Sequence, residues 1–472
     1  MVADGSHNVV LLCLDSVRKD FFDIYAQRLR EAAGVEFAQC RAASSWSTPS
    51  HASMFSGQLP HRHGIHTHDR SFDSLARGET FLAALDEYTT LSVSENVFAG
   101  SAYDFDQLFD VHDEPAPGQY YPDALSSQEF AERFDGGGIE QYARYLVASL
   151  SHERPLRSLA NGVLTKTRRS ESIGLLAKLL GVSGPAVMNT AEQRIENVSE
   201  PYFAFLNVME AHVPLRYIWG LEELHCDVPD TWTSAERGVW ELFDRSRDHS
   251  EYWRNRRALY GMVIEYLDRY VSEFVERVQA HSDLETTVIV TADHGENLGY
   301  EAENYLANHK SSLSEGLLHV PLSIINPPNG YETTEHTYFS HLDLGRLITG
   351  MAHGKTPDVF RHRIPAEVIG LSAGPEPPVD YDYAELDRLI RCVYNGERKI
   401  EWDSLGRSFE YSIDHERPCW QAKTIENVEV PEWATSFFDA PAAESKRHAR
   451  EQSRSQTVDA ATASRLEELG YL

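Results

Sequence analysis

The sequence predicts an α/β protein organised around a large, mainly parallel β-sheet. Short, continuously apolar runs, of the kind buried on both faces of a parallel sheet, alternate with helical patterns along most of the chain. Polar residues follow several of these runs directly, as expected where ligands bind at the carboxyl edge of an open sheet. After residue 376 the pattern changes to short runs separated by turn residues, which is typical of antiparallel strands.

The first expected strand covers residues 8–14 and ends in Asp15. Apolar residues then recur at helical spacing from Phe21 to Leu29, so this strand leads into a helix. A carboxylate at the carboxyl end of a strand is a candidate metal ligand, and a helix-capping aspartate would occupy the same position. Both interpretations of Asp15 are open at this point.

Residues 44–57 read Ser-Ser-Trp-Ser-Thr-Pro-Ser-His-Ala-Ser-Met-Phe-Ser-Gly. A proline suits a first helical turn and Gly57 suits a helix end, so we expect a loop that enters a short helix. Ser47 then lies against the positive end of that helix, where amides and the dipole favour an alkoxide, a sulfate or a phosphate. The alternative is an ordinary Ser/Thr cap.

The remaining pattern supplies further strands and helices. Strands are expected at residues 35–40, 89–94, 202–208, 286–292 and 320–325, and helices at 81–88 and 260–278. His212 follows the third of these strands, and Lys310 precedes the last.

The strand at 286–292 ends in Asp293-His294-Gly295. Adjacent aspartate and histidine with a turning glycine suit cation binding better than packing, because a carboxylate is not buried unpaired. The sheet therefore brings a set of polar residues to one edge. That set is Asp15, Ser47, His212, Asp293, His294 and Lys310.

Composition limits the function classes. The 472 residues include 73 acidic and 43 basic side chains, and the net charge of −30 disfavours binding to nucleic acid or an anionic membrane. Only eight of the basic residues are lysine, an acidic and lysine-poor pattern that resembles proteins of salt-loving microbes. Five scattered cysteines show no metal-ligand spacing, and no secretion signal or membrane span is apparent. These features predict a cytoplasmic protein with reduced thiols.

We expect two units along the chain. Residues 1–375 form the catalytic domain, with a peripheral insertion at about 100–200 where hydrophobic periodicity is poor. Residues 376–472 form a small α+β subdomain with short antiparallel strands and a final helix near 463–469.

The set of motifs resembles the sulfatase family of the alkaline-phosphatase superfamily. Ser47-Thr48-Pro49-Ser50-His51 is similar to the nucleophile signature, in which Cys or Ser, any residue, then Pro-Ser-Arg lead into a helix. Asp15 and Asp293-His294-Gly295 match metal-binding segments, and His212 and Lys310 match active-site residues. The ending, residues 466–472, is also frequent in the family. The resemblance implies an alkaline-phosphatase-like α/β/α sandwich and a metal-dependent hydrolase of sulfate esters.

The resemblance also implies roles and a cofactor. Asp15, Asp293, His294 and Ser47 would hold one divalent cation, with Ca²⁺ as the first expectation and Mn²⁺, Mg²⁺ or Zn²⁺ as alternatives. Ser47 would carry the covalent intermediate, as serine or after conversion to formylglycine. Lys310 and His212 would contact the transferred group or the leaving group. Expected substrates are a small anionic ester or a sulfated glycan.

Three departures from the family pattern keep other functions open. His51 replaces the signature arginine, Ser16 replaces a frequent second aspartate, and residues 95–96 lack a Lys-Trp-His cluster. With unmodified Ser47 as the nucleophile, the protein would be a phosphate or phosphonate ester hydrolase or a phosphotransferase. A degenerate sulfatase-like binding protein is the non-enzymatic alternative. The sequence does not specify the oligomeric state.

Overall fold

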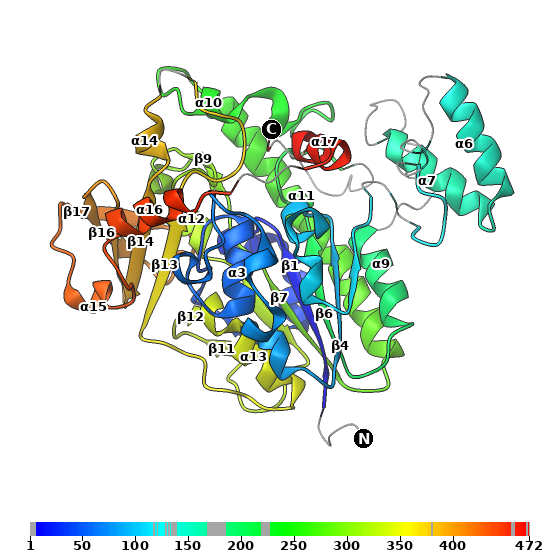
Figure 1. The fold of residues 1–472 in the computed structure, drawn as a ribbon, viewed down its shortest axis with the longest axis horizontal. Coiled ribbons are helices and arrows are strands. Elements are labelled where there is room, and N and C mark those ends of the chain that lie inside the picture. The colour runs from blue at the N-terminus through cyan, green and yellow to red at the C-terminus, as the bar shows by residue number, and fades with distance from the viewer. Residues whose placement is uncertain are drawn as a thin grey trace.

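The computed structural model describes residues 6–116, 119, 121–127, 130, 133, 139–167, 186–218, 227–378, 381–454, 458–468 and 471. At its centre lies an eight-stranded sheet in the order β11-β2-β10-β7-β1-β6-β4-β5 (Figure 1). Its strands are β1 (Asn8–Leu14), β2 (Val35–Phe37), β4 (Thr89–Ser94), β5 (Val111–Asp113), β6 (Tyr202–Val208), β7 (Thr286–Thr291), β10 (Leu322–Ile325) and β11 (Thr334–Glu335). Only β10 runs against the other strands. The mainly parallel sheet is therefore confirmed.

The central strands are buried on both faces. Every residue of β1, β6 and β7 is buried, which explains their mainly apolar sequences. Cys13 near the end of β1 pairs with Asn207 of β6 and Thr291 of β7. Because these three strands run in the same direction and end in register, the residues that follow them leave the sheet at one edge.

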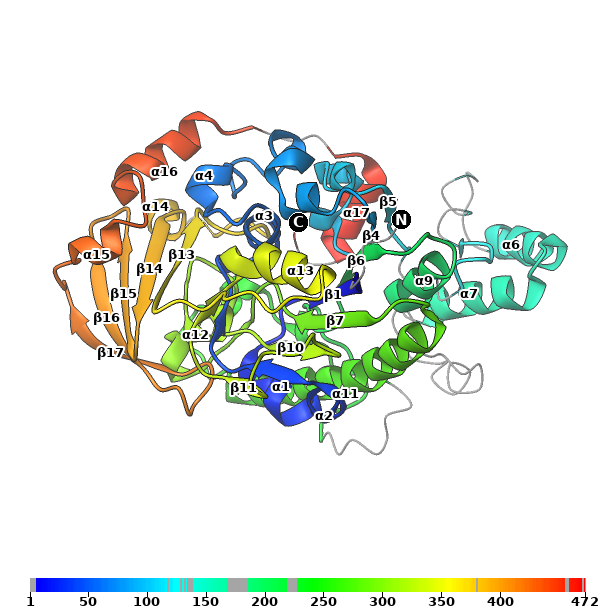
Figure 2. The same ribbon diagram turned by 90° about the horizontal axis from the view of Figure 1, so that it is seen from below.

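Two helical layers cover the sheet (Figure 2). On one side, α11 (Ser250–His281) packs with α1 (Lys19–Tyr25), α2 (Gln27–Ala32) and α9 (Ala186–Ile195). On the other side lie α3 (Ser47–Ser56) and α13 (Leu344–Ala352). Phe55 of α3 meets Phe205 of β6 edge to face, with ring centroids 5.3 Å apart. The α/β/α arrangement agrees with the predicted fold class.

The predicted helix at 81–88 is wrong in its extent. The chain forms only a 3₁₀ turn, Phe81–Ala84, capped by the Thr80 side chain. Leu85 leaves the helical region, and a turn at Tyr88 leads directly into β4. The β-branched pair that begins β4 favours an extended backbone, so no room is left for a longer helix.

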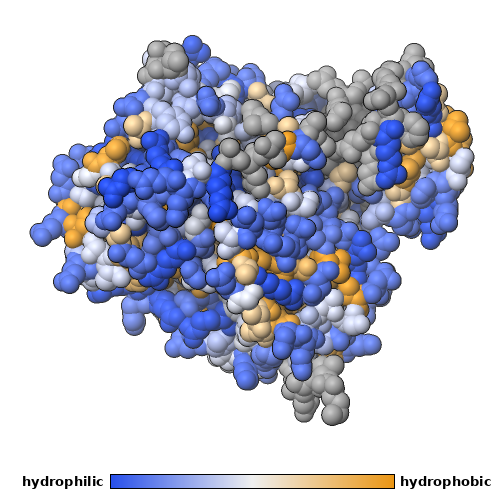
Figure 3. Space-filling model, in the orientation of Figure 1, coloured by the Kyte–Doolittle hydropathy of each residue, from blue (hydrophilic) through white to orange (hydrophobic). Residues whose placement is uncertain are grey.

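The region between 100 and 200 contains elements of two kinds. β5 extends the central sheet beside β4, and α9 packs on β4 and β6. The helices α6 (Ile139–Ser151) and α7 (Pro155–Thr167) instead form a hairpin at one end of the molecule (Figure 1). Apolar side chains of α6 are exposed there and contribute to the orange patch at the upper right of Figure 3; they are Leu146, Val147 and Leu150. Tyr142 of the same helix is also exposed.

A separate antiparallel sheet of five strands lies at the other end of the molecule. Its strands are β13 (Arg363–Ile369), β14 (Leu389–Asn395), β15 (Arg398–Asp403), β16 (Ser408–Ile413) and β17 (Gln421–Glu426). It carries its own apolar cluster, which includes Val393, Ile400 and Phe438. The predicted antiparallel strands are therefore present, and they begin with β13.

The remaining elements are short. Two-stranded sheets pair β3 (Cys40–Arg41) with β12 (Phe339–Ser340) and β8 (Asn297–Leu298) with β9 (Ala307–Asn308). The other α-helices are α4 (Pro60–His63), α10 (Val239–Leu242), α12 (Glu315–Leu318), α14 (Tyr383–Leu386), α15 (Glu432–Thr435), α16 (Ala442–Glu451) and α17 (Ala460–Glu468). Within the described part of the chain, no helix has the length and apolar character needed to cross a membrane.

Candidate active site

Three buried side chains meet where β1 and β7 end. Asp15, Asp293 and His294 each offer a ligand atom, and these atoms lie within 4.8 Å of one another. The Nε2 atom of His294 is 3.5 Å from Asp293 Oδ2 and 4.0 Å from Asp15 Oδ1. His294 Nδ1 lies 2.7 Å from the carbonyl oxygen of Gly295. In the neutral tautomer with the proton on Nδ1, this atom donates to that carbonyl, and Nε2 faces the carboxylates with a free lone pair.

Ser47 adds a hydroxyl to this cluster from the first turn of α3. Its Oγ donates to Asp15 Oδ2 at 3.3 Å and lies 3.4 Å from His294 Nε2. The helix then ends at Gly57, whose left-handed φ of 68° lets its amide bond to the carbonyl of Ser53. The loop and helix expected for residues 44–57 are therefore present, with Ser47 directed at the two strand ends.

The electrostatics of the cluster favour a cation. Burial, followed by the charge of Asp15, raises the pKa of Asp293 to about 7. Burial opposes ionisation of Asp15 as well, but the imidazoles of His212 and His294 and the Ser16 hydroxyl bring the pKa of Asp15 below its ordinary value. Two carboxylates in one fully buried site repel each other, and a divalent ion removes that repulsion.

The donor set fits such an ion. Asp293 Oδ2 is buried and has no hydrogen-bond partner among the described residues. An unpaired carboxylate oxygen beside a second carboxylate and an imidazole lone pair matches the ligands of divalent cations. Asp15, Asp293 and His294 can therefore hold a metal, with the Ser47 hydroxyl beside it.

Local backbone features orient the two carboxylates. Ser16 adopts a left-handed φ of 63°, and its amide donates to Asp293 Oδ1 at 3.2 Å while its hydroxyl donates to Asp15 Oδ1 at 2.8 Å. Ser16 thus binds both carboxylates. At Gly295, a Cβ atom would lie 2.1 Å from the carbonyl oxygen of Gly316, so only glycine fits after the Asp-His pair.

His51 lies on the inner side of the cluster. Its Nε2 atom is 3.6 Å from Asp293 Oδ2 and 3.3 Å from Asn207 Nδ2, and its ring packs edge to face on Phe205. Burial lowers the pKa of His51 to about 4, so the imidazole is neutral at pH 7. This side chain therefore supplies no permanent positive charge at the position of the signature arginine.

His212 follows β6, and both of its ring nitrogens have partners. Nδ1 is 2.6 Å from the carbonyl oxygen of Val213, and Nε2 is 2.7 Å from the hydroxyl of Tyr471. Burial lowers the pKa of His212, although the charge of Asp15 opposes this effect. His212 thus interacts electrostatically with the cluster but forms no hydrogen bond with any described residue of the cluster.

Lys310 is buried, and its ammonium group donates to the carbonyl oxygens of Ser372 and Ala373. Burial, and then the nearby charge of Arg70, lower the pKa of Lys310 to about 7. Arg70 itself lies over the rings of Trp46 and Phe98, at 6.0 and 5.9 Å from their centroids. It forms no ion pair with any described residue, and its Nε atom donates to the carbonyl oxygen of Thr67 at 3.3 Å.

Four residues near the site were not predicted from the sequence. The side chain of Asn96 donates from Nδ2 to Asp15 Oδ2 at 2.8 Å, and its position just after β4 was a usable signal. Ser16 was noted only as the replacement of a frequent second aspartate, and its contacts depend on backbone conformation. Arg70 and Tyr471 carried no comparable signal, because their places depend on contacts distant in sequence. Of the predicted residues, the structure brings Asp15, Ser47, His51, Asp293 and His294 into one cluster, with His212 and Lys310 around it.

Comparison with known proteins places these features in context. The family model described as Sulfatase matches residues 7–354. No curated protein matches the chain by sequence.

Solved structures with a similar fold include three enzymes or enzyme relatives. A 2-O GAG sulfatase aligns with a TM-score of 0.53 at 13% identity, over 86% of this chain and 85% of its own. The phosphonate monoester hydrolase of Agrobacterium radiobacter gives 0.53 at 14% identity, over 86% and 89%. A protein of the alkaline phosphatase superfamily from Vibrio parahaemolyticus gives 0.51 at 15% identity, over 96% and 89%.

Proposed function

The chain belongs to the sulfatase family and is an ester-bond hydrolase, and on this premise we propose that it hydrolyses sulfate esters through a covalent intermediate at residue 47. The observation that carries the proposal is the position of Ser47. Its hydroxyl lies at 3.3 Å from Asp15 and 3.4 Å from His294, within the set of residues that can hold a metal.

Asp15, Asp293 and His294 would hold one divalent cation, and the side chain of residue 47 would complete its ligand set. Such an ion neutralises charge on the transferred group and lowers the pKa of a neighbouring nucleophile. Hard oxygen ligands from two carboxylates favour Ca²⁺, and the single imidazole is also compatible with Mn²⁺, Mg²⁺ or Zn²⁺.

The reaction divides into two steps. In the first, the oxygen of residue 47 forms a bond to sulfur while the bond from sulfur to the leaving oxygen breaks, and the leaving oxygen takes up the proton that residue 47 gives up. In the second, with serine at residue 47, a water oxygen forms a bond to sulfur while the bond from sulfur to Oγ breaks; Oγ takes up a proton from that water and inorganic sulfate leaves. With hydrated formylglycine at residue 47, the second hydroxyl gives up its proton, the carbon–oxygen bond to the sulfate group breaks, and water hydrates the aldehyde that forms. Asp15 and Asn96 hold the oxygen of residue 47 in place during both steps, since Asn96 fixes the carboxylate that accepts from Ser47.

Positive charge on the opposite side would come from Lys310 and Arg70. Arg70 lies over Trp46, the residue before Ser47, and its charge lowers the pKa of Lys310, so the two cations lie near each other. An anionic ester restores the charge of a lysine whose pKa has been lowered, so binding and protonation reinforce each other. The expected substrates are therefore small anionic esters or sulfated glycans.

Hydrolysis of a phosphate or phosphonate ester by unmodified Ser47 is the second candidate. The observation that favours it is His51, which is neutral and directed at Asp293 where the family signature has an arginine.

Three further proposals rest on the sequence. They are a cytoplasmic location, an adaptation to high salt and a separate subdomain at 376–472.

The experiment combines mass spectrometry with turnover. The peptide that contains Ser47 is analysed intact, and hydrolysis of an aryl sulfate and an aryl phosphate is measured with Ca²⁺, Mn²⁺, Mg²⁺ or Zn²⁺. Loss of two hydrogens at Ser47 together with sulfate turnover supports the sulfatase. Unmodified Ser47 with phosphate turnover that Ser47→Ala abolishes rejects it in favour of the second candidate. No turnover and no metal-dependent stabilisation would support a binding protein.

A further inference from the structure

The penultimate residue of the chain reaches the active site. Tyr471 is only 5% exposed, and its hydroxyl lies 2.7 Å from Nε2 of His212. Its ring packs edge to face on Phe98, with centroids 4.7 Å apart, and Phe98 packs in the same way on Trp46. Trp46 immediately precedes Ser47, so Tyr471 belongs to one continuous aromatic wall beside the nucleophile.

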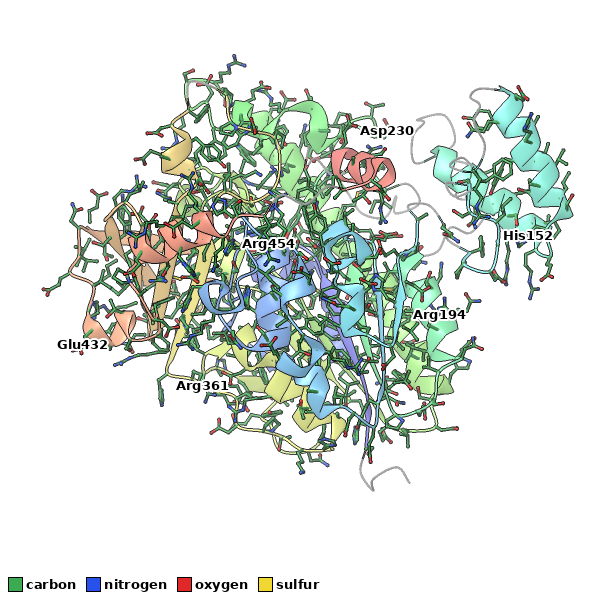
Figure 4. All side chains as sticks on the ribbon, in the orientation of Figure 1. His152, Arg194, Asp230, Arg361, Glu432 and Arg454 are labelled. Carbon is green, nitrogen blue, oxygen red and sulfur yellow. The ribbon has the colours of Figure 1, made fainter. Side chains whose placement is uncertain are left out.

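Contacts of the described C-terminal residues hold this segment against the rest of the molecule. Arg454, labelled in Figure 4, pairs with Asp69 and Asp73, and its amide donates to the carbonyl of His68. The helix α17, drawn in red in Figure 1, lies beyond it.

Arg465 of that helix donates to the carbonyl oxygen of Glu95 at 2.8 Å, directly beside Asn96. The amide of Tyr471 then donates to the carbonyl of Leu466 at 2.8 Å and turns the chain toward His212. Residues 469, 470 and 472 of the predicted ending lie outside the described residues.

The hydrogen bonds define which group donates. When Nδ1 of His212 carries the proton and donates to the Val213 carbonyl, Nε2 is left as an acceptor. The Tyr471 hydroxyl must then be the donor to Nε2. Burial and the charges of Asp15 and Asp293 raise the pKa of Tyr471 well above its ordinary value, so the phenol keeps its proton.

We propose that Tyr471 is a positioning residue of the active site: its hydroxyl occupies Nε2 of His212 and fixes the imidazole beside the residue-47 nucleophile. This inference rests on the proposed function, because it assigns the role to ester hydrolysis at residue 47. Tyr471 thus acts on the reaction through His212.

The test compares the full chain with Tyr471→Phe, with a chain that ends at residue 470, and with Tyr88→Phe. Tyr88 is a matched control, because its buried hydroxyl also donates one hydrogen bond but lies at the opposite edge of the sheet, where it meets the carbonyl of Ala352. We measure kcat and KM on whichever of the two aryl esters, sulfate or phosphate, is hydrolysed faster, and we measure metal-dependent thermal stabilisation. Peptide mass spectrometry follows the rate at which diethyl pyrocarbonate modifies His212.

Tyr471→Phe should lower kcat about tenfold with KM within about twofold, since one hydrogen bond is lost and the ring is kept. The truncated chain should lose more, because the ring contact with Phe98 is also removed. His212 should react faster in Tyr471→Phe than in the full chain or in Tyr88→Phe, because its Nε2 atom is released. Metal-dependent stabilisation should be unchanged in Tyr471→Phe, which excludes general unfolding.

Equal kcat in Tyr471→Phe and Tyr88→Phe would overturn the proposal, and so would equal modification of His212 in the two variants. If the full chain hydrolyses neither ester, the proposed function fails. The labelling of His212 then decides alone: faster modification in Tyr471→Phe supports the contact, and an equal rate refutes it.

Discussion

Lys310 provides the most quantitative prediction, because its pKa of about 7 places the change in its charge within the range of an ordinary assay. At pH 7 about half of the molecules carry the ammonium ion, and at pH 9 about one in a hundred do. Sulfate stays a dianion over this range. If it binds beside Lys310, its inhibition constant should rise about fiftyfold between pH 7 and pH 9.

The variant Lys310→Met removes this charge and keeps most of the side-chain volume. Its inhibition constant for sulfate should be high at pH 7 and should show a much weaker pH dependence. Lys355→Met is the control, because Lys355 is exposed and follows α13 near the amino end of β1. Inhibition of aryl ester hydrolysis at constant ionic strength measures the effect. The same dependence on pH in wild type and Lys310→Met would refute the role of Lys310 in anion binding.

Protein stability tests the same pKa without any substrate. The folded pKa of Lys310 lies below its ordinary value of 10.5, so between about pH 7 and pH 10 the unfolded chain holds a proton that the folded chain lacks. The free energy of unfolding of wild type should therefore rise with pH relative to Lys310→Met, by up to about 1.4 kcal/mol per pH unit. Urea denaturation at several pH values measures this difference, and parallel curves would show that the lysine stays charged.

Three other predictions concern the cluster at the strand ends. Ser47→Ala should reduce turnover at least about a thousandfold while metal-dependent thermal stabilisation persists; a smaller loss would mean that another group is the nucleophile. Asn96→Ala should weaken binding of the divalent cation about 10- to 100-fold in a calorimetric titration, because Asp15 loses its amide partner; an unchanged affinity would contradict this role. Gly295→Ala should lower the free energy of unfolding by several kcal/mol, and the melting temperature with it, because the Cβ atom of the alanine would lie 2.1 Å from the carbonyl oxygen of Gly316. An unchanged melting temperature would show that the two backbone segments can separate.

The sequence predicts the core of the fold well, because the central strands carry a simple signal. β1, β6 and β7 are buried throughout and mainly apolar in sequence, since both of their faces are covered by helices. The signal was weak where short elements depend on their surroundings. Residues 81–88 contain enough apolar residues for a helix, but the cap at Thr80 and the start of β4 leave only a 3₁₀ turn. The strand expected at 35–40 is interrupted, and the structure has two short strands there, β2 and β3.

The site residues that directly follow a strand were the easiest to predict from the sequence. Asp15 and the Asp293-His294 pair lie at strand ends, so their meeting follows from a parallel sheet. Ser16 was considered only as a substitute for a ligand, and its actual contacts depend on a left-handed backbone that the sequence does not indicate. Arg70 and Tyr471 come from segments that pack against Phe98 from distant parts of the chain, and no local pattern encodes such contacts.

His51 changes which groups can supply positive charge to the site, compared with an arginine at the same position. It lies four residues after Ser47 on α3 and so shares its helix face, which is why an arginine at this position could reach the nucleophile. Here the imidazole is shorter, fully buried, neutral and directed at Asp293 and Asn207. Positive charge for an anionic ester would then come from a cation held by Asp15, Asp293 and His294 and from Lys310 and Arg70. Replacing His51 by arginine would therefore place a second charge next to Asp293, where it would compete with the metal for the unpaired Oδ2 atom.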